Sequence, residues 1–283
     1  MIQDIGPQKF NNAFDREAVP ECEDLIVVFR DGNMLLGTDD RESRISFPRL
    51  KNFRNELRLL YFFEVSGERF FYAYDFGDNE NGQGVPEGFE FCSLKQLRSK
   101  YYQPKHYVFA AYTAFHLIDW YEANRFCGKC GERNTFSKTE RALVCPKCGH
   151  TRYPRINPAV IVGVINGDKL LLTKYRTGFA HNALVAGFTE IGETIEETVM
   201  REVMEETGLR VKNIRYYKSQ PWGTASDILM GFYCDVDGDT TIHMDDSELK
   251  YAEWVKREDI VLQPLDYSLT NEMMRLFKEH NNI

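Results

Sequence analysis

The chain has 283 residues, about twice the usual size of one domain, so we expect two compact units or one unit with a small module. Hydrophobic residues make up 43% of the chain and aromatic residues 13%, which excludes a disordered protein. The net charge of -8 argues against broad electrostatic binding of nucleic acid, and no apolar run or signal sequence predicts a membrane span or export, so we expect a cytoplasmic protein.

The first hundred residues are typical of a sheet assembled from short hairpins. Phe, Tyr and Val, which favour strands, are frequent in the paired segments 24–29 and 33–37, and again in 59–65 and 69–76. The segment 78–88 combines Gly, Pro, Asn and acidic residues and is predicted to be an exposed loop. The sequence therefore predicts a strand-rich N-terminal domain.

A predicted amphipathic helix closes this domain, and further strands and helices follow the cysteine pairs. Apolar residues recur at helical spacing over 105–124. Segments 157–165 and 169–175 are predicted strands joined by an Asn-Gly turn. The remaining predictions are a helix near 194–207, strands at 214–220, 228–236 and 251–256, and a final helix at 268–280. This order predicts an α+β fold, with a mixed sheet between helices.

Four cysteines occur as two CxxC pairs, Cys127 with Cys130 and Cys145 with Cys148. Fourteen residues separate the pairs, a spacing suited to one tetrahedral zinc site. Four thiolates would leave no open position for water, so the zinc would be structural. The alternative, two redox-active dithiols, fits two pairs in one cytosolic chain less well.

Three carboxylates share one edge of the helix near 194–207. Glu202, Glu205 and Glu206 stand at positions i, i+3 and i+4, beside an apolar stripe and before Gly208, a natural helix end. Like charges at this spacing repel one another, and a hard divalent cation such as Mg²⁺ or Mn²⁺ would offset the repulsion. The alternative is a solvated acidic face. We expect Glu206 to be exposed.

Residues in and around this helix match, at the required spacings, the signature pattern called the Nudix box. They are Gly187, Glu193, Arg201-Glu202, Glu205-Glu206 and Gly208-Leu209. The chain thus resembles the Nudix hydrolases, which implies an α-β-α sandwich. The resemblance implies that Glu202 and Glu206 bind the catalytic metal, that Glu205 helps hold metal or water, and that Arg201 with Glu193 braces the loop against the helix.

Flanking motifs narrow the resemblance to the bacterial NADH pyrophosphatases, which also act on NAD-capped RNA. These motifs are the two CxxC pairs, TRYPRINPAVIVGV, Ala186-Gly187-Phe188 and the SQPW at 219–222. The resemblance covers roughly residues 115–283. It divides the chain into a strand-rich N-terminal domain ending in a helix (1–123), a zinc ribbon (124–151) and a Nudix domain (152–283).

The same resemblance assigns roles to five further residues. It implies that Tyr153 and Phe188 sandwich a base, that Glu140 contacts the substrate, that the carbonyl of Ala186 binds metal, and that Glu248 is an additional carboxylate ligand. Stacking requires flat π faces, which both aromatic residues supply. The alternative for both is ordinary core packing.

The substrate-binding residues implied downstream are Gln220 and Trp222, and more weakly Thr270 in Ser268-Leu269-Thr270. After Trp222 the chain departs from the family, which has a proline-rich stretch and a serine there. Here the residues are Gly-Thr-Ala-Ser-Asp, ending in Asp227. We expect an Asp at this point to alter substrate selectivity.

The implied reaction is metal-dependent hydrolysis of the pyrophosphate of NAD(H), giving nicotinamide mononucleotide and AMP, with NAD-capped RNA allowed as a second substrate. Mg²⁺ or Mn²⁺ would be the catalytic ion and Zn²⁺ the structural one. The family implies a homodimer, in which Tyr153 can serve the partner's site. Two alternatives stay open: a relaxed dinucleotide or ADP-sugar pyrophosphatase, and a nucleic-acid-binding regulator with a Nudix fold.

Overall fold

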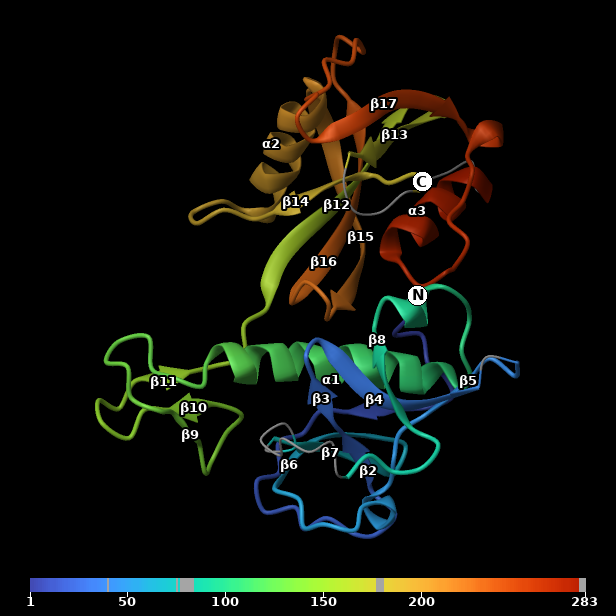
Figure 1. Cartoon of the computed structure of the whole chain (residues 1–283). Helices are drawn as coiled ribbons and strands as arrows, with labels where there is room; N and C mark the ends of the chain where they lie inside the picture. Colours follow the sequence, from blue (N-terminus) through green and yellow to red (C-terminus); the bar gives the residue numbers. More distant parts are fainter. Residues whose placement is uncertain (40, 75, 77–83, 177–180, 280–283) are drawn as a thin grey trace. The chain divides into compact units, whose positions relative to one another are not determined.

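The computed structural model describes residues 1–39, 41–74, 76, 84–176 and 181–279 (Figure 1). It divides into two compact units. Unit 1 comprises Met1, Ile156–Trp222 and Ser226–Ile283, and unit 2 comprises Ile2–Arg155 and Gly223–Ala225. No helix in the described part of the chain is long and apolar enough to cross a membrane.

A mixed sheet forms the centre of unit 1. Its strands follow the order β15-β16-β12-β13-β17, with β14 also paired to β12. The β12–β16 pair is parallel and the other pairs are antiparallel. The bounds are β12 Asn157–Asn166, β13 Lys169–Tyr175, β14 Val185–Phe188, β15 Val211–Trp222, β16 Asp227–Val236 and β17 Leu249–Lys256. The Asn-Gly hairpin is confirmed by the pair of Asn166 with Lys169.

Two helices cover opposite faces of this sheet, α2 (Ile195–Thr207) and α3 (Leu269–Glu279) (Figure 1). Successive strand residues point to opposite faces. Val160 and Val162 accordingly pack in one core cluster with Val199 of α2, whereas Ile161 packs in another with Met273 of α3. The predicted α-β-α sandwich is therefore confirmed.

The ends of α2 are set by local sequence. The Thr194 hydroxyl accepts a hydrogen bond from the backbone N–H of Glu197, and the Glu197 side chain accepts one from the Thr194 N–H, which forms a capping box. Gly208 ends the helix with a φ of 71°, a left-handed conformation that favours glycine. The structure confirms the helix predicted near 194–207.

The described N-terminal part of unit 2, before α1, holds two small sheets. One has the order β1-β6-β7-β2, and the other contains β3, β4 and β5 with β8 paired to β4. The segment predicted as one strand at 24–29 is divided between them, because β2 pairs in parallel with β7 whereas β3 forms the hairpin with β4. The bounds are β1 Phe10–Asn11, β2 Leu25–Val27, β3 Phe29–Arg30, β4 Asn33–Asp39, β5 Arg44–Ser46, β6 Leu59–Val65, β7 Glu68–Ala73 and β8 Glu90–Ser93.

Helix α1 (Lys105–Ala123) leads from these sheets to a three-stranded ribbon of β9 (Thr135–Phe136), β10 (Leu143–Val144) and β11 (Thr151–Arg152). Arg141 joins the ribbon to the N-terminal sheet, since its Nη2 donates a hydrogen bond of 2.7 Å to the carbonyl of Phe62 in β6. Of the predicted loop at 78–88, residues 78–83 lie outside the described residues.

Candidate active site and zinc site

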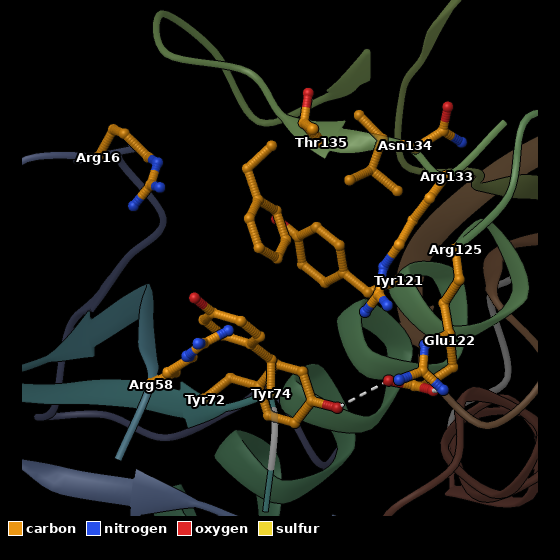
Figure 2. A pocket seen from close by; sticks show the side chains of 12 residues that line it. Arg16, Arg58, Tyr72, Tyr74, Tyr121, Glu122, Arg125, Arg133, Asn134 and Thr135 are labelled. Carbon is orange, nitrogen blue, oxygen red and sulfur yellow. Dashed lines mark hydrogen bonds and ion pairs between the residues drawn. The ribbon is translucent and has the colours of Figure 1, made fainter. Parts of the chain in front are cut away.

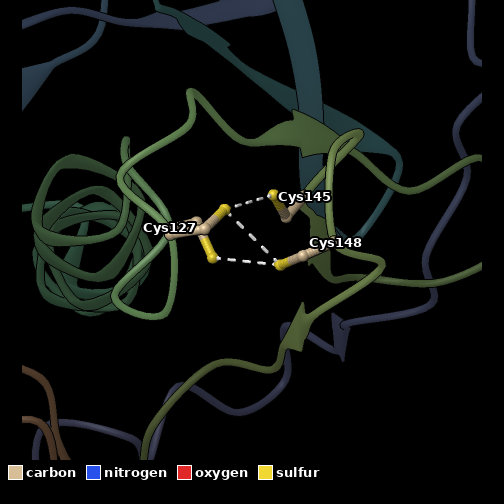
Figure 3. Close-up of side chains that lie close together, drawn as sticks. Cys127, Cys145 and Cys148 are labelled. Carbon is tan, nitrogen blue, oxygen red and sulfur yellow. Dashed lines mark hydrogen bonds between the residues drawn. The ribbon is translucent and has the colours of Figure 1, made fainter.

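The four ribbon cysteines converge on one point. Their sulfur atoms all lie within 4.8 Å of one another, with separations of 3.7 Å for Cys127–Cys148, 3.5 Å for Cys130–Cys145 and 3.6 Å for Cys130–Cys148 (Figure 3). A tetrahedron with Zn–S bonds of about 2.3 Å has S···S edges of about 3.8 Å. The separations match those edges and are far longer than a disulfide bond of about 2.05 Å.

Both CxxC pairs fold into the same backbone turn. The N–H of Gly131 donates to the carbonyl of Cys127 at 2.8 Å, and the N–H of Gly149 donates to the carbonyl of Cys145 at 2.9 Å. Both glycines have positive φ angles, as such turns require. The backbone N–H of Lys129 donates to the Cys127 sulfur and lowers the pKa of this thiol to about 7. These features fit a structural zinc bound by thiolates.

In unit 1, the guanidinium of Arg201 ties the loop before α2 to the helix. It donates two hydrogen bonds to Glu193, of 2.6 and 2.9 Å, and one to the carbonyl of Phe188 at 2.8 Å. It also donates to Glu202 at 2.8 Å and to Glu205 at 2.9 Å. Hydrogen bonding to Arg201 lowers the pKa of Glu193 to about 2. The bracing of loop and helix implied by the family resemblance is present in this geometry.

Gly187 leaves the space that the Glu202 carboxylate occupies. A Cβ atom added to Gly187 would come within 1.9 to 2.2 Å of the carboxyl atoms of Glu202. Any other residue here would therefore displace this carboxylate. Burial is the main reason that the pKa of Glu202 is raised, although the bond to Arg201 opposes the shift. Glu202 is held against β14 by shape as well as by charge.

Glu206 is buried, with an exposed fraction of 2%, so the expectation of an exposed carboxylate was wrong. Its Oε1 accepts a hydrogen bond of 2.8 Å from the Tyr175 hydroxyl, while its buried Oε2 has no hydrogen-bond partner among the described residues. Burial raises the pKa of Glu206 to about 8, with Glu202 and Glu248 adding repulsion. A buried carboxylate oxygen without a partner is costly unless a cation binds it.

The set of oxygen donors near Glu206 suits a hard divalent cation. Glu202 and Glu248 lie close enough to Glu206 to raise its pKa, and the carbonyl of Ala186 lies 3.4 Å from the Tyr175 hydroxyl that binds Glu206. Such carboxylate and carbonyl oxygens are the ligands that Mg²⁺ and Mn²⁺ prefer. Among the described residues, only the four cysteines form a group of three or more candidate ligands that lie mutually close.

Tyr175 is a site residue that sequence reasoning missed. It ends β13 and is paired with Leu249, the residue after Glu248, where the register of β13 and β17 shifts. Its hydroxyl donates to Glu206 and accepts from the N–H of Ala186 at 3.2 Å. Burial is the main cause of its raised pKa, so it stays a neutral donor. Its position at the end of a predicted strand, before the Nudix box, was the only feature of the sequence that could have indicated this role.

The predicted base-stacking residues are both accessible. Tyr153 has an exposed fraction of 59% and Phe188 one of 50%, values that do not fit core packing. The hydroxyl of Tyr153 donates to Glu140 at 3.0 Å, which joins two residues that the resemblance assigned to substrate contacts. Tyr153 and Glu140 belong to unit 2, whereas Phe188 ends β14 in unit 1.

The other predicted contact residues have varied surroundings. Gln220 is buried, and its amide donates to the carbonyl of Tyr267 and accepts from the N–H of Leu269 at the start of α3, so this side chain positions main chain. Asp227 is also buried, at the start of β16. Trp222, at the end of β15, and Thr270, in the first turn of α3, are half-buried.

Two protein-family models match this chain, and the matches agree with the geometry of the zinc ribbon and of the Nudix box. Residues 155–277 match the family described as the NUDIX domain, and residues 122–153 match the NADH pyrophosphatase zinc ribbon domain. The chain carries a Nudix domain and a zinc ribbon. The resemblance drawn from the sequence is therefore confirmed, and the four clustered cysteines are those of the ribbon.

Similar curated proteins are named NAD-capped RNA hydrolase NudC. The protein from Enterobacter sp. (strain 638) is 43% identical over 152 residues, which cover 52% of this chain and 57% of that protein. The protein from Yersinia pestis (strain Pestoides F) is 37% identical over 174 residues, which cover 59% of this chain and 66% of that protein. The chain thus spans less than two thirds of the length of these relatives.

Among solved structures, a NUDIX hydrolase from Nitrosomonas europaea matches with a TM-score of 0.48 and 23% identity, over 55% of this chain and 91% of that one.

We predict that the zinc ribbon holds about one zinc per chain. Cys145→Ser should lose this metal and lower the free energy of unfolding by several kcal/mol, because zinc binding and ribbon folding are coupled. Cys22→Ser removes an exposed thiol outside the cluster and is the matched control. Elemental analysis and thermal melts measure both effects. Full stability of a zinc-free preparation would contradict the structural role.

We also predict a pH-dependent stability of the Nudix domain without added Mg²⁺ or Mn²⁺. The pKa of Glu206 is raised to about 8, so between pH 4.5 and 8 the folded state holds a proton that the unfolded state releases. The contribution of Glu206 to the free energy of unfolding is therefore fully present below pH 4.5. It falls as the pH rises and is lost above about 8, a change on the order of a few kcal/mol.

Glu206→Gln cannot lose this proton, so the melting temperature of wild type relative to this variant should fall as the pH rises from 5.5 to 8.5. Glu205→Gln changes an exposed carboxylate on the same helix and should keep the wild-type slope. The measurement is a series of thermal melts of the three proteins across this pH range, each with zinc bound at the ribbon. Parallel curves for wild type and Glu206→Gln would show that the carboxylate is already ionised in the fold.

Proposed function

We propose that this chain is a metal-dependent hydrolase that cleaves the pyrophosphate of NAD(H), giving nicotinamide mononucleotide and AMP, and that removes the NAD cap from RNA. The observation that carries the proposal is the buried Glu206, whose Oε2 lacks a partner beside Glu202. The curated relatives named NAD-capped RNA hydrolase support the choice of substrate. We place this activity in the cytoplasm, where both substrates occur.

In this proposal, Glu202, Glu206, Glu248 and the Ala186 carbonyl hold Mg²⁺ or Mn²⁺. When bound, the ion neutralises pyrophosphate charge and lowers the pKa of a water that attacks phosphorus. The chain contributes the preorganised ligands. Glu206 would bind the ion as a carboxylate, after giving its proton to solvent, with its Oε1 held by the Tyr175 hydroxyl. Arg201 holds Glu202 and Glu205 in position.

Phe188 and Tyr153 would supply flat rings to a base of the substrate, with Glu140 as a polar contact. The exposure of both rings and the Tyr153–Glu140 hydrogen bond support this assignment. We further propose a homodimer in which Tyr153 serves the partner's site, as the family resemblance implies. Trp222 and Thr270 are proposed contacts, and Gln220 would act by positioning Tyr267 and Leu269.

A second candidate is a pyrophosphatase with relaxed specificity for dinucleotides or ADP-sugars. The segment that follows Trp222 favours it, since residues 223–226 lack the prolines that the resemblance leads us to expect, which leaves this turn less restricted, and Asp227 follows directly. A regulator without catalysis is less well supported, because a mere ligand sensor has no need of the complete carboxylate set around Glu206.

We predict that Glu206→Gln lowers the kcat for NADH in saturating Mn²⁺ to less than a tenth of the wild-type value, a loss above about 1.4 kcal/mol. The amide keeps the shape of the side chain but loses the charge that holds a hard cation. Glu248→Gln, at an exposed supporting ligand, should lose less. The assay resolves AMP from other products across NADH, NAD⁺, ADP-sugars and NAD-capped RNA.

Retention of more than a tenth of kcat by Glu206→Gln, in protein that melts normally, would show that this carboxylate cluster is not the catalytic metal site. Equal kcat/KM for NADH and for ADP-sugars would favour the relaxed pyrophosphatase over the NAD(H)-selective enzyme.

We predict that Phe188→Ala and Tyr153→Ala chiefly raise KM for NADH, by about tenfold, because base stacking is worth on the order of 1–3 kcal/mol. Tyr153→Phe keeps the ring and removes only the bond to Glu140, so it should stay near wild type. Phe126→Ala removes an equally exposed ring elsewhere in the ribbon region and serves as the control. An unchanged KM for both variants in steady-state kinetics would show that neither ring contacts the base.

A further inference from the structure

Unit 2 contains a pocket that the proposed reaction does not use. Its volume is about 410 Å³, and every residue that lines it belongs to unit 2 (Figure 2). Tyr72 and Tyr74 come from β7 and the residue that follows it, Tyr121 comes from α1, and Phe136 comes from β9 of the ribbon. The pocket thus joins the N-terminal sheet, the helix and the ribbon.

Positive charge dominates the rim of this pocket. Arg16 and Arg58 approach from one side, and Arg125 and Arg133 from the other (Figure 2). Among the described residues that line the pocket, Glu122 is the one carboxylate. A chain with a net charge of -8 has no general excess of cations, so four arginines around one pocket concentrate charge against the overall trend. Such a concentration attracts an anionic ligand.

Glu122 offsets the charge of one arginine, Arg125, with which it forms an ion pair. Tyr72 donates to Oε1 at 3.0 Å, and Arg125 lies 3.5 Å from Oε2. The bond from Tyr72 connects the end of α1 to β7. The carboxylate therefore orders the wall and orients Arg125, while the other arginines remain on the rim. Guanidinium groups match the oxygen geometry of phosphate.

Aromatic rings form the wall between the arginines. The ring of Phe136 lies 5.2 Å from that of Tyr74 and 5.5 Å from that of Tyr121, both edge to face. The guanidinium of Arg16 lies over Phe136, 5.7 Å from the ring centre. Tyr74 and Phe136 are half-buried, so part of each ring is accessible from the pocket. These rings can contact a flat heteroaromatic ring.

We propose that this pocket binds a free mononucleotide, with its phosphate at the arginines and its base against Tyr74 and Phe136. The volume lies within the range of about 300–1,000 Å³ that is usual for small-molecule sites. An inorganic anion would leave the aromatic wall unused. A long nucleic acid would require an extended basic track rather than one pocket in an acidic chain. The proposal does not depend on the hydrolase activity.

The probe is radiolabelled AMP, measured by equilibrium dialysis on the full chain with ribbon zinc retained and no added Mg²⁺ or Mn²⁺. All variants carry Phe188→Ala, which weakens base stacking in the Nudix domain. In this background the double change Arg16→Gln and Arg133→Gln should weaken AMP binding at least tenfold. Arg54→Gln, an exposed arginine of unit 2 outside the pocket, should change it less than twofold.

A second variant tests the aromatic wall. Phe136→Leu keeps an apolar side chain but removes the ring, so AMP binding should weaken while inorganic phosphate binding stays unchanged, and melting curves check that the ribbon is folded. Three results would overturn the proposal. These are AMP binding that survives the double arginine change, equal affinity for AMP and inorganic phosphate, or arginine-dependent binding of a short RNA without binding of AMP.

Discussion

The guanidinium of Arg201 makes the contacts on which the arrangement of the Nudix box depends. It joins Glu193 in the loop, Glu202 and Glu205 on α2, and the carbonyl of Phe188 at the end of β14. Three carboxylates so close together would repel one another without it. Charge-assisted, bidentate hydrogen bonds of this kind are stronger than neutral ones and fix geometry. Loop, strand and helix are thereby held in one arrangement.

This arrangement lets one carboxylate be buried without a countercharge. Glu206 is buried, and among the described residues only Tyr175 donates a side-chain hydrogen bond to it; its pKa is raised to about 8. The group is therefore protonated at neutral pH. In the proposed metal site, cation binding would release this proton, so the affinity for a divalent ion would rise with pH. The neighbouring Glu202, fitted over Gly187, has its own bond to Arg201 and is less dependent on such an ion.

In unit 2, a cationic side chain connects two parts of the fold. Half-buried Arg141 connects the ribbon to the N-terminal sheet through the Phe62 carbonyl, and desolvation of its guanidinium lowers its pKa. The ribbon zinc site orders the short strands that carry Phe136, and this ring then closes one side of the arginine-lined pocket. A small metal-bound module thus completes a surface that neither the sheet nor α1 could form alone.

Features that depend on local spacing could be predicted from the sequence. They are the glycine end of α2, the Asn166-Gly167 hairpin, the two CxxC turns and the Nudix box residues, each specified by residues close together in the chain. The burial of Glu206 and the role of Tyr175 could not be predicted, because they depend on how β13 and β14 pack beside α2. The division of 24–29 between two sheets and the assembly of the arginine pocket likewise follow from pairing between segments far apart in the chain. Periodicity indicates which face of an element is apolar, but it does not identify the partner that packs against that face.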